Sequence, residues 1–397
     1  MPIKQGKLME SELAYVLINP YMIRKSRTGG IIARILARTD LNFVAARMFG
    51  PSKALAIEYA ELIKEGATDV NPIIAEELHK YIMHEYAPSE RSGNPHRTML
   101  LLFDGPSAIQ KIQHVVGGIT ARATSGLSIR DTYGDFIEDS EDKIRYFEPA
   151  VIVGHDREYT YKALRLWAKH ADQGGIIDFH GSFGKPGVER TLVMLKPDNF
   201  KEPSLRAGNI IDMLSAAGLR LICVNKFTMT FEQANNFYGQ VQSALYDKFN
   251  MICGEKLNSA ISGALGLEGK LSEEDIEAIR PTLGPLYAKR QFDSIIEFMT
   301  GLNPSKLSKD GNDITHSKGC LALVYQGQNA IEKIREALGP TDPTKAKPGS
   351  VRREFGSNIM VNAAHASDSP ENAAREMEIV GVEKDYIKYW VDQYCTE

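Results

Sequence analysis

The sequence lacks the features that would mark a secreted or membrane-bound protein. Its 397 residues include only four cysteines, at positions 223, 253, 320 and 395, and none has the close spacing of a metal-binding or redox pair. No uninterrupted apolar run reaches about 18 residues, which a membrane-spanning helix would need, and residues 1–15 contain no apolar signal core. We therefore expect a cytoplasmic protein with free thiols and no membrane partner.

An excess of charge of either sign is also lacking. Lysine and arginine number 47 and aspartate and glutamate 51, which gives a net charge of -4. Such a balance provides no global attraction for nucleic acid, so we expect no nucleic-acid partner. No carboxylate cluster indicates a metal site built by the protein itself, so we expect no metal-ligating residues. The length and the hydrophobic content of 43% favour two or three domains with ample cores.

A histidine precedes a predicted helix near the end of the chain. Residues 362–380 read NAAHASDSPENAAREMEIV, which places His365 four residues before Ser369. Ser369 is a suitable N-cap, Pro370 suits the first helical position, and Glu371 adds negative charge at the positive end of the helix dipole. Apolar residues then recur at helical spacing. A histidine in such a place is more often structural than catalytic, so its role depends on other residues.

Three upstream segments supply that context. Residues 190–200 (RTLVMLKPDNF) predict a strand that ends in Lys-Pro-Asp, and residues 208–227 predict a helix, a glycine stop and a second strand. Residues 329–356 predict a helix followed by a Gly-Pro-Thr turn and a Pro-Gly turn. These elements are typical of a split βαβ unit.

In this order the segments resemble the nucleoside diphosphate kinase family. Strand-Lys-Pro-Asp, a helix with arginine, Gly-x-Thr-x-Pro, Lys-Pro-Gly-x-x-Arg and Asn-x-x-His-x-Ser-Asp-Ser are each weak alone but specific in combination. The resemblance implies an α/β (α+β) fold of the ferredoxin-like kind, an antiparallel sheet covered by helices. It also implies a nucleoside-diphosphate kinase that passes the γ-phosphate of ATP to nucleoside diphosphates by a ping-pong phosphohistidine mechanism, with Mg²⁺ entering on the nucleotide.

The same resemblance implies roles for individual residues. His365 would be the nucleophile, because a largely neutral imidazole can attack a phosphate without a separate base, and Glu376 and Ser367 would orient it. The positions that match nucleotide-binding groups of the family are Lys196, Tyr238, Arg335, Thr341, Arg352 and Asn362. Arginine forks and a neutral hydroxyl supply the positive charge and the positioning that phosphoryl transfer requires. Which ring nitrogen attacks is left open.

Two positions depart from the family pattern. Ala366 follows the histidine where the family usually has glycine, a change that the chain tolerates if φ there is negative. The ring that stacks on the base falls on either Gln291 or Phe292. Base recognition is therefore less well defined than phosphate chemistry.

The chain also repeats itself. Residues 14–49 run parallel to residues 191–227, and residues 99–112 resemble residues 321–334. We therefore predict two tandem nucleoside diphosphate kinase domains. The glycine-rich stretch 170–189 would connect them.

The predicted domains are a degenerate copy at 1–175 and a catalytic copy at 187–397, with insertions near 242–286 and 302–318. Within the first insertion, residues 257–286 predict a helical hairpin, which would act either as a lid over the nucleotide or as a packing element. The first copy has lost most of the matched groups: Asn19 replaces Lys196, Gln113 replaces Arg335, Ile119 replaces Thr341, and the histidine position falls on Val153 or Ile152. Arg130 alone keeps the phosphate-binding pattern.

We expect ATP and nucleoside diphosphates as ligands. We also expect a homo-oligomer, either a trimer or a dimer of tandem chains, in which the degenerate copy completes an interface. The alternative function is a nucleotide-sensing or scaffold protein with vestigial kinase activity. The complete set of matched residues in the second copy favours the enzyme.

Overall fold

The computed structural model describes residues 11–68, 71–120, 126–140, 143–179, 182–247, 249, 260, 272–306 and 318–395. The chain forms two compact units: Thr228–Lys318 build the smaller, and Pro2–Phe227 with Gly319–Glu397 build the larger. The larger unit carries an eight-stranded sheet, and the smaller carries two long helices. No helix of the described residues is long and apolar enough to cross a membrane.

The sheet consists of two halves with the same topology. Its strand order is β10-β7-β9-β8-β2-β3-β1-β6. The first half contains β1 (Glu12–Ile18), β2 (Asn42–Phe49), β3 (Thr98–Gly105) and β6 (Val151–Val153), and the second half contains β7 (Val188–Leu195), β8 (Arg220–Thr228), β9 (Gly319–Gln328) and β10 (Ala364–Ala366). Each half has the spatial order fourth, first, third, second. The first strand of each half pairs antiparallel with the third and the fourth, and β2 pairs antiparallel with β3. This ferredoxin-like arrangement confirms the predicted fold class.

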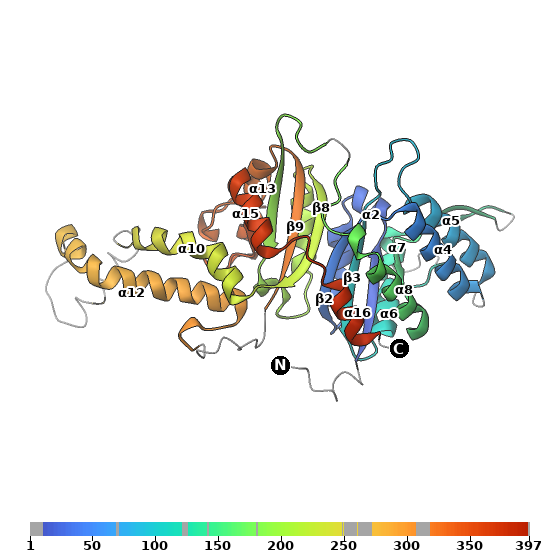
Figure 1. Cartoon of the computed structure of the whole chain (residues 1–397), viewed down its shortest axis with the longest axis horizontal. Coiled ribbons are helices and arrows are strands. Elements are labelled where there is room, and N and C mark those ends of the chain that lie inside the picture. The colour runs from blue at the N-terminus through green and yellow to red at the C-terminus, as the bar shows by residue number, and fades with distance from the viewer. Residues whose placement is uncertain are drawn as a thin grey trace. The chain divides into compact units, whose positions relative to one another are not determined.

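The two halves share one continuous sheet. Their edge strands β2 and β8 pair antiparallel at Arg47 and Asn225, and Figure 1 shows these strands adjacent within the larger unit. Above this seam, α3 (Thr28–Arg38) of the first half packs against α9 (Arg206–Ser215) of the second. A Cβ atom added to Gly208 would lie 2.3 Å from the carbonyl oxygen of Gly29. The seam therefore depends on glycine at the helix crossing.

Helices cover both faces of the sheet. The first half has α2 (Pro20–Arg24), α4 (Lys53–Thr68), α5 (Pro72–Glu85), α6 (Ala108–Val116), α7 (Ile129–Tyr133), α8 (Arg157–Lys169) and a small hairpin of β4 (Asp135–Glu138) and β5 (Ile144–Glu148). The second half has α13 (Ala330–Leu338), α14 (Val351–Phe355), α15 (Pro370–Val380) and α16 (Ile387–Tyr394). Alternate residues of β1 enter two different cores, Val16 one and Leu17 the other, because successive side chains of a strand point to opposite faces. The central strands are therefore buried on both faces.

The last helix of the chain crosses back to the first half. Ile387 and Val391 of α16 are buried in the same core as Trp167 of α8. Arg47 holds the preceding segment by donating to the carbonyl oxygens of Glu383 and Lys384, at 2.9 and 2.8 Å. The two halves are thus joined by the sheet and by the end of the chain.

The smaller unit contains α10 (Phe231–Asp247) and α12 (Glu273–Thr300), which pack against each other. Ser272 and Asp275 form a capping box at the start of α12. Of the predicted hairpin over 257–286, the part from Glu273 onward is helix, and most of 257–271 lies outside the described residues. Residues 307–317 of the second predicted insertion also lie outside the described residues.

Free thiols were predicted for the cysteines. Cys223, Cys320 and Cys395 are free and buried. Cys253 lies outside the described residues.

Candidate active site

Several predicted residues that are far apart in sequence line one cavity of the larger unit. This cavity has a volume of about 790 Å³ and is bounded by the end of α13, the turn that follows it, α14 and β10. Its lining includes Arg335, Thr341, Arg352 and His365. The cavity brings four of the expected groups together.

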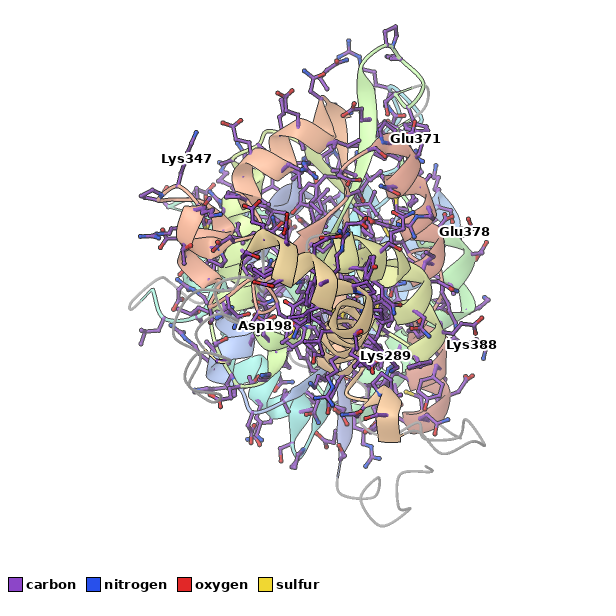
Figure 2. The ribbon with its side chains drawn as sticks, turned by 90° about the vertical axis from the view of Figure 1, so that its left-hand side faces the viewer. Asp198, Lys289, Lys347, Glu371, Glu378 and Lys388 are labelled. Carbon is purple, nitrogen blue, oxygen red and sulfur yellow. The ribbon has the colours of Figure 1, made fainter. Side chains whose placement is uncertain are left out.

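His365 lies in the middle of β10 and is held from behind by α15. Its Nε2 atom lies 2.8 Å from Oε2 of Glu376, and the Ser367 hydroxyl donates to the same oxygen at 2.7 Å. Glu376 is only 5 % exposed, whereas Glu371 and Glu378 of the same helix extend away from the ribbon (Figure 2). Because a carboxylate accepts hydrogen bonds, this contact places a hydrogen on Nε2 and the lone pair on Nδ1.

The helix begins as the sequence predicts. The Ser369 side chain accepts a hydrogen bond from the amide of Asn372 at 3.1 Å, and Pro370 occupies the first turn. Ala373, Glu376 and Val380 form the buried face of α15. The N-cap therefore sets the phase of the helix that turns Glu376 toward the histidine.

A left-handed residue leads into the histidine strand. Ala363 has φ of +69° and is fully buried, a conformation that costs a residue with a Cβ roughly 1–2 kcal/mol. Its carbonyl oxygen accepts hydrogen bonds from the Lys196 amide and from the Asn199 side chain, at 2.9 and 2.7 Å. Ala366, where the family usually has glycine, has no such positive φ. The unusual backbone thus lies two residues before His365 rather than one residue after it.

Lys196 directly follows the last residue of β7 and is almost completely buried. Its Nζ atom donates to Oδ1 of Asn362 at 2.6 Å and to the carbonyl of Met360 at 3.1 Å. Burial, and secondarily the charge of Arg352, lowers the pKa of Lys196 to about 8. Asn362 in turn donates to the carbonyl of Thr341 at 3.0 Å. Neither Lys196 nor Asn362 belongs to the cavity lining. They connect to it through Thr341, which does line the cavity.

The two predicted arginines differ in their surroundings. Arg352 donates to the carbonyls of Gly339 and Ala364, at 2.7 and 3.0 Å, and burial followed by the charge of Arg335 lowers its pKa to about 10. Arg335, in the last turn of α13, forms no ion pair within the described residues and faces the same cavity. Arg352 therefore ties the turn to β10, while Arg335 presents its charge to the cavity.

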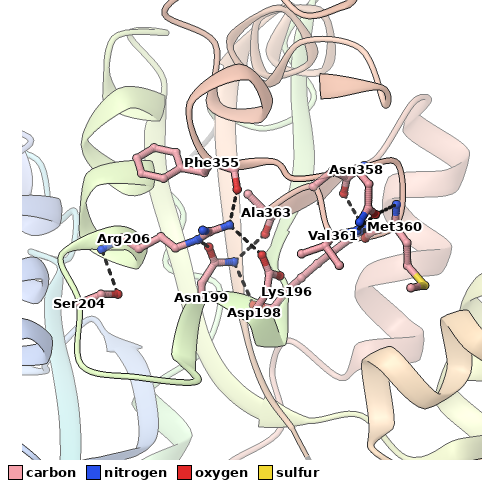
Figure 3. A network of polar contacts seen from close by, with 11 residues as sticks. Lys196, Asp198, Asn199, Ser204, Arg206, Phe355, Asn358, Met360, Val361 and Ala363 are labelled. Carbon is pink, nitrogen blue, oxygen red and sulfur yellow. Dashed lines mark hydrogen bonds and ion pairs between the residues drawn. The ribbon is translucent and has the colours of Figure 1, made fainter. Parts of the chain in front are cut away.

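Sequence reasoning missed part of this site. Lys345 and Lys347 also line the cavity and increase its positive charge. A second omission is Arg206, which donates to Asn199 and Asp198 at 2.8 and 2.9 Å (Figure 3). The two lysines could have been found from the basic run beside Arg352, but the Arg206 contacts depend on the folded loop.

Comparison with known proteins identifies the family. The family model described as nucleoside diphosphate kinase matches residues 189–303 and 288–385. The chain belongs to the nucleoside diphosphate kinase family. Relatives named nucleoside diphosphate kinase include those of Bdellovibrio bacteriovorus, 28% identical over 190 residues, and Persephonella marina, 29% identical over 190 residues. Each match covers 48% of this chain, and 90% and 91% of the respective relative.

A solved structure is also similar to the chain. The NDP kinase from Pyrobaculum aerophilum is 24% identical, with a TM-score of 0.34, over 48% of this chain and 94% of that one. The sequence relatives identify this chain as a member of a phosphotransferase enzyme family.

The sheet register identifies the kinase histidine position in the first half. His365 lies opposite Met194, and the corresponding partner of Leu17 is Ile152. Of the two predicted positions, Ile152 is therefore the equivalent one. Ala150 has φ of +60°, so the first half also keeps the left-handed turn before this strand.

Arg130 in the first half makes the same kind of backbone contacts that Arg352 makes in the second half. It donates to the carbonyls of Gly117 and Val151 at 2.7 and 3.1 Å, the counterparts of the contacts that Arg352 makes. Burial lowers the pKa of Arg130 to about 10. The retained arginine thus has a backbone-tying function that does not need a nucleotide.

The lysine position of the first half is filled by an internal polar network. The side-chain amide of Asn19 donates to Oε1 of Glu148 at 3.1 Å, and its Oδ1 accepts a hydrogen bond from the Tyr86 hydroxyl at 2.7 Å. The Tyr81 hydroxyl donates to the other oxygen of Glu148 at 2.7 Å. Glu148 is 4 % exposed, and burial raises the pKa of its carboxyl. A carboxyl group thus lies near the place where the second half has an ammonium group.

Tyr238 lies on α10 in the smaller unit, where it is 8 % exposed and its ring lies 4.9 Å from that of Phe237. Its role in nucleotide binding stays a prediction. On α12, Phe292 is buried and Gln291 is exposed. No group of three metal-ligating side chains occurs in the part of the chain that the structure describes.

Proposed function

We propose that the second half of the chain transfers the γ-phosphate of ATP to nucleoside diphosphates through a phosphohistidine on His365. The observation that carries this proposal is the contact of Nε2 with the buried carboxylate of Glu376, on a histidine that lines a basic cavity. A carboxylate behind an imidazole stabilises the positive charge that develops as the ring attacks.

The proposed reaction has two successive phosphoryl-transfer steps. The Nδ1 lone pair of His365 attacks the γ-phosphorus of ATP, a P–N bond forms, the bond to the bridging oxygen breaks, and ADP leaves with that electron pair. A second nucleoside diphosphate then uses its terminal phosphate oxygen to attack phosphohistidine, and the ring recovers its lone pair. Arg335 and the neighbouring lysines would stabilise the negative charge on the phosphoryl oxygens in both steps.

Magnesium fits this site only as a companion of the nucleotide. Asp368 and Glu336 are the carboxylates that line the cavity, and they form no three-ligand group within the described residues. When bound, the ion would neutralise charge on the phosphate chain. The residues of this chain would position the phosphates around it.

We further propose that residues 187–397 are the catalytic part and that residues 1–175 are catalytically silent. The asparagine at the lysine position, the isoleucine at the histidine position and the Glu148 network support this division. The first half would serve by covering the β8 edge, which in a single-copy protein would be exposed or paired with another chain. A trimer or a dimer of the whole chain and a cytoplasmic location stay predictions.

The test is labelling with γ-labelled ATP. The wild-type chain should acquire acid-labile, base-stable label, and His365→Ala should acquire none while keeping the fold. His155→Ala is the matched control, because this histidine of the first half has a 39% exposed side chain and lies three residues after Ile152. Label that persists in His365→Ala would show that another group is the nucleophile. An unlabelled wild-type chain would favour the scaffold function.

A further inference from the structure

A second cavity lies where the two halves of the larger unit meet. Its volume is about 470 Å³, and it shares no lining residue with the cavity beside His365. The first half contributes Arg24, Thr28 and Arg97, and the second half contributes Arg220 and Tyr325. Its volume is in the range of small-molecule sites.

The lining of this cavity, the junction cavity, contains three arginines and no carboxylate. Arg97 is 8 % exposed and donates to the carbonyl of Leu221 across the seam. Neither Arg97 nor Arg220 forms an ion pair within the described residues, and their guanidinium carbons lie 5.5 and 4.7 Å from the centre of the Phe179 ring. Arg24 is paired at 2.9 Å with Glu85. Of these three guanidinium groups, only that of Arg24 has a carboxylate partner within the described residues.

The pKa of Arg97 agrees with this charge balance. Burial lowers it to about 10, and the further causes are the positive charges of Arg220 and Arg24. An anion bound among these groups would relieve their mutual repulsion.

One neutral donor in the same cavity has no partner among the described residues. The Tyr325 side chain is 2 % exposed, and its hydroxyl has no hydrogen-bond partner among the described residues. Burial raises the pKa of this hydroxyl well above its ordinary value, so it remains a donor at neutral pH. Thr28 opens the 11-residue helix α3, whose N-terminal end favours negative charge. A buried hydroxyl without a partner costs free energy that a ligand oxygen would recover.

We propose that the junction cavity is a second anion site that binds a polyphosphate chain, either free or as part of a nucleotide. Arginine forks match phosphate oxygens with two donors each, and the Tyr325 hydroxyl supplies a further donor. The site needs both halves of the chain, since Arg97 and Arg220 come from different halves. The tandem arrangement thereby creates a ligand site that neither copy has alone. This proposal does not rest on phosphotransfer by His365.

The test is calorimetric titration of the full chain with tripolyphosphate. The wild type should show two sites. Arg220→Gln and Tyr325→Phe should each weaken one of them by about tenfold or more, and Arg335→Ala should weaken only the other. Arg220 is exposed and Tyr325→Phe removes a single oxygen, so both variants should fold. Arg91→Gln is the matched control, because Arg91 is exposed and lines neither cavity.

Labelling from ATP separates this site from the proposed function. Arg220→Gln and Tyr325→Phe should label normally on His365, whatever happens at the junction. ATP that competes at both sites would identify a nucleotide as the ligand, and binding of tripolyphosphate alone would identify free polyphosphate. Wild-type affinity at every observed site in both junction variants, or tighter binding of citrate than of tripolyphosphate, would overturn the proposal. A single site that only Arg335→Ala weakens would overturn it as well.

Discussion

A nucleotide that reaches Lys196 should draw a proton onto it. Burial lowers the pKa of this lysine from its ordinary value of 10.5 to about 8, so at pH 9 only about 10% of the free protein carries the ammonium form. A phosphate group close to Nζ favours the charged form and raises the pKa again. If the pKa returns to its ordinary value, binding at pH 9 should take up about 0.9 proton.

The proton uptake can be measured by calorimetry of ADP binding at pH 9 in two buffers of different ionisation enthalpy. At this pH the phosphates of ADP are fully ionised, so the nucleotide contributes no proton of its own. Lys196→Met should abolish the uptake. Lys226→Met is the matched control, because burial also lowers the pKa of Lys226 to about 8. The Nζ atom of Lys226 lies 4.5 Å from the centre of the Phe200 ring, and Lys226 is not one of the predicted nucleotide-binding residues.

Two outcomes would refute the reasoning about Lys196. One is ADP binding at pH 9 with no proton uptake, which would show that the phosphates do not approach Nζ. The other is uptake that persists in Lys196→Met, which would assign the proton to a different group. Uptake lost only in Lys226→Met would move the nucleotide to the other buried lysine.

Four further predictions follow from the same contacts. Gly208→Ala should lower the free energy of unfolding, measured by urea titration, by about 1–3 kcal/mol, because its Cβ would meet rigid backbone of α3 at 2.3 Å. The control Gly239→Ala, which has no atom within 4 Å of the added Cβ, should raise the free energy of unfolding by up to about 1 kcal/mol. Equal effects of the two substitutions would contradict the seam packing. Glu376→Gln should slow phosphohistidine formation by about tenfold to a hundredfold in rapid-quench experiments with ATP affinity retained; a wild-type rate would remove the carboxylate from the mechanism. Ile152→His in a His365→Ala background should acquire no label from ATP, and any label would show that the first half binds triphosphate productively. Residues 187–397 expressed alone should be poorly soluble, because β8 loses its neighbour and α16 loses its core; a soluble and active fragment would show that the first half is dispensable.

Local physics allowed much of the second half to be predicted from the sequence. The helix after His365 begins at Pro370 because the signals that start it, the Ser369 cap and the proline, lie within one turn of each other. The motif order then identified His365, Glu376 and Ser367 together, and in the structure both His365 and Ser367 contact the carboxylate of Glu376. The catalytic roles of these residues stay predictions that the labelling experiment will test.

Other features depend on contacts that no sequence window contains. The register of β6 against β1 decided between Val153 and Ile152, because a shift by one residue turns a strand's side chains to the opposite face. Tyr81 and Tyr86 reach the lysine position of the first half only because α5 folds over it.

Short-range propensity and motifs of fixed spacing were enough to predict the elements, the duplication and the chemical groups of the second half. The pairing of β2 with β8, which joins the copies into one sheet, and the meeting of Arg97 and Arg220 at one cavity appear only in the folded chain. Edge pairing and the meeting of distant guanidinium groups arise from how whole layers pack. Their partners lie more than 100 residues apart, beyond the range of any local signal.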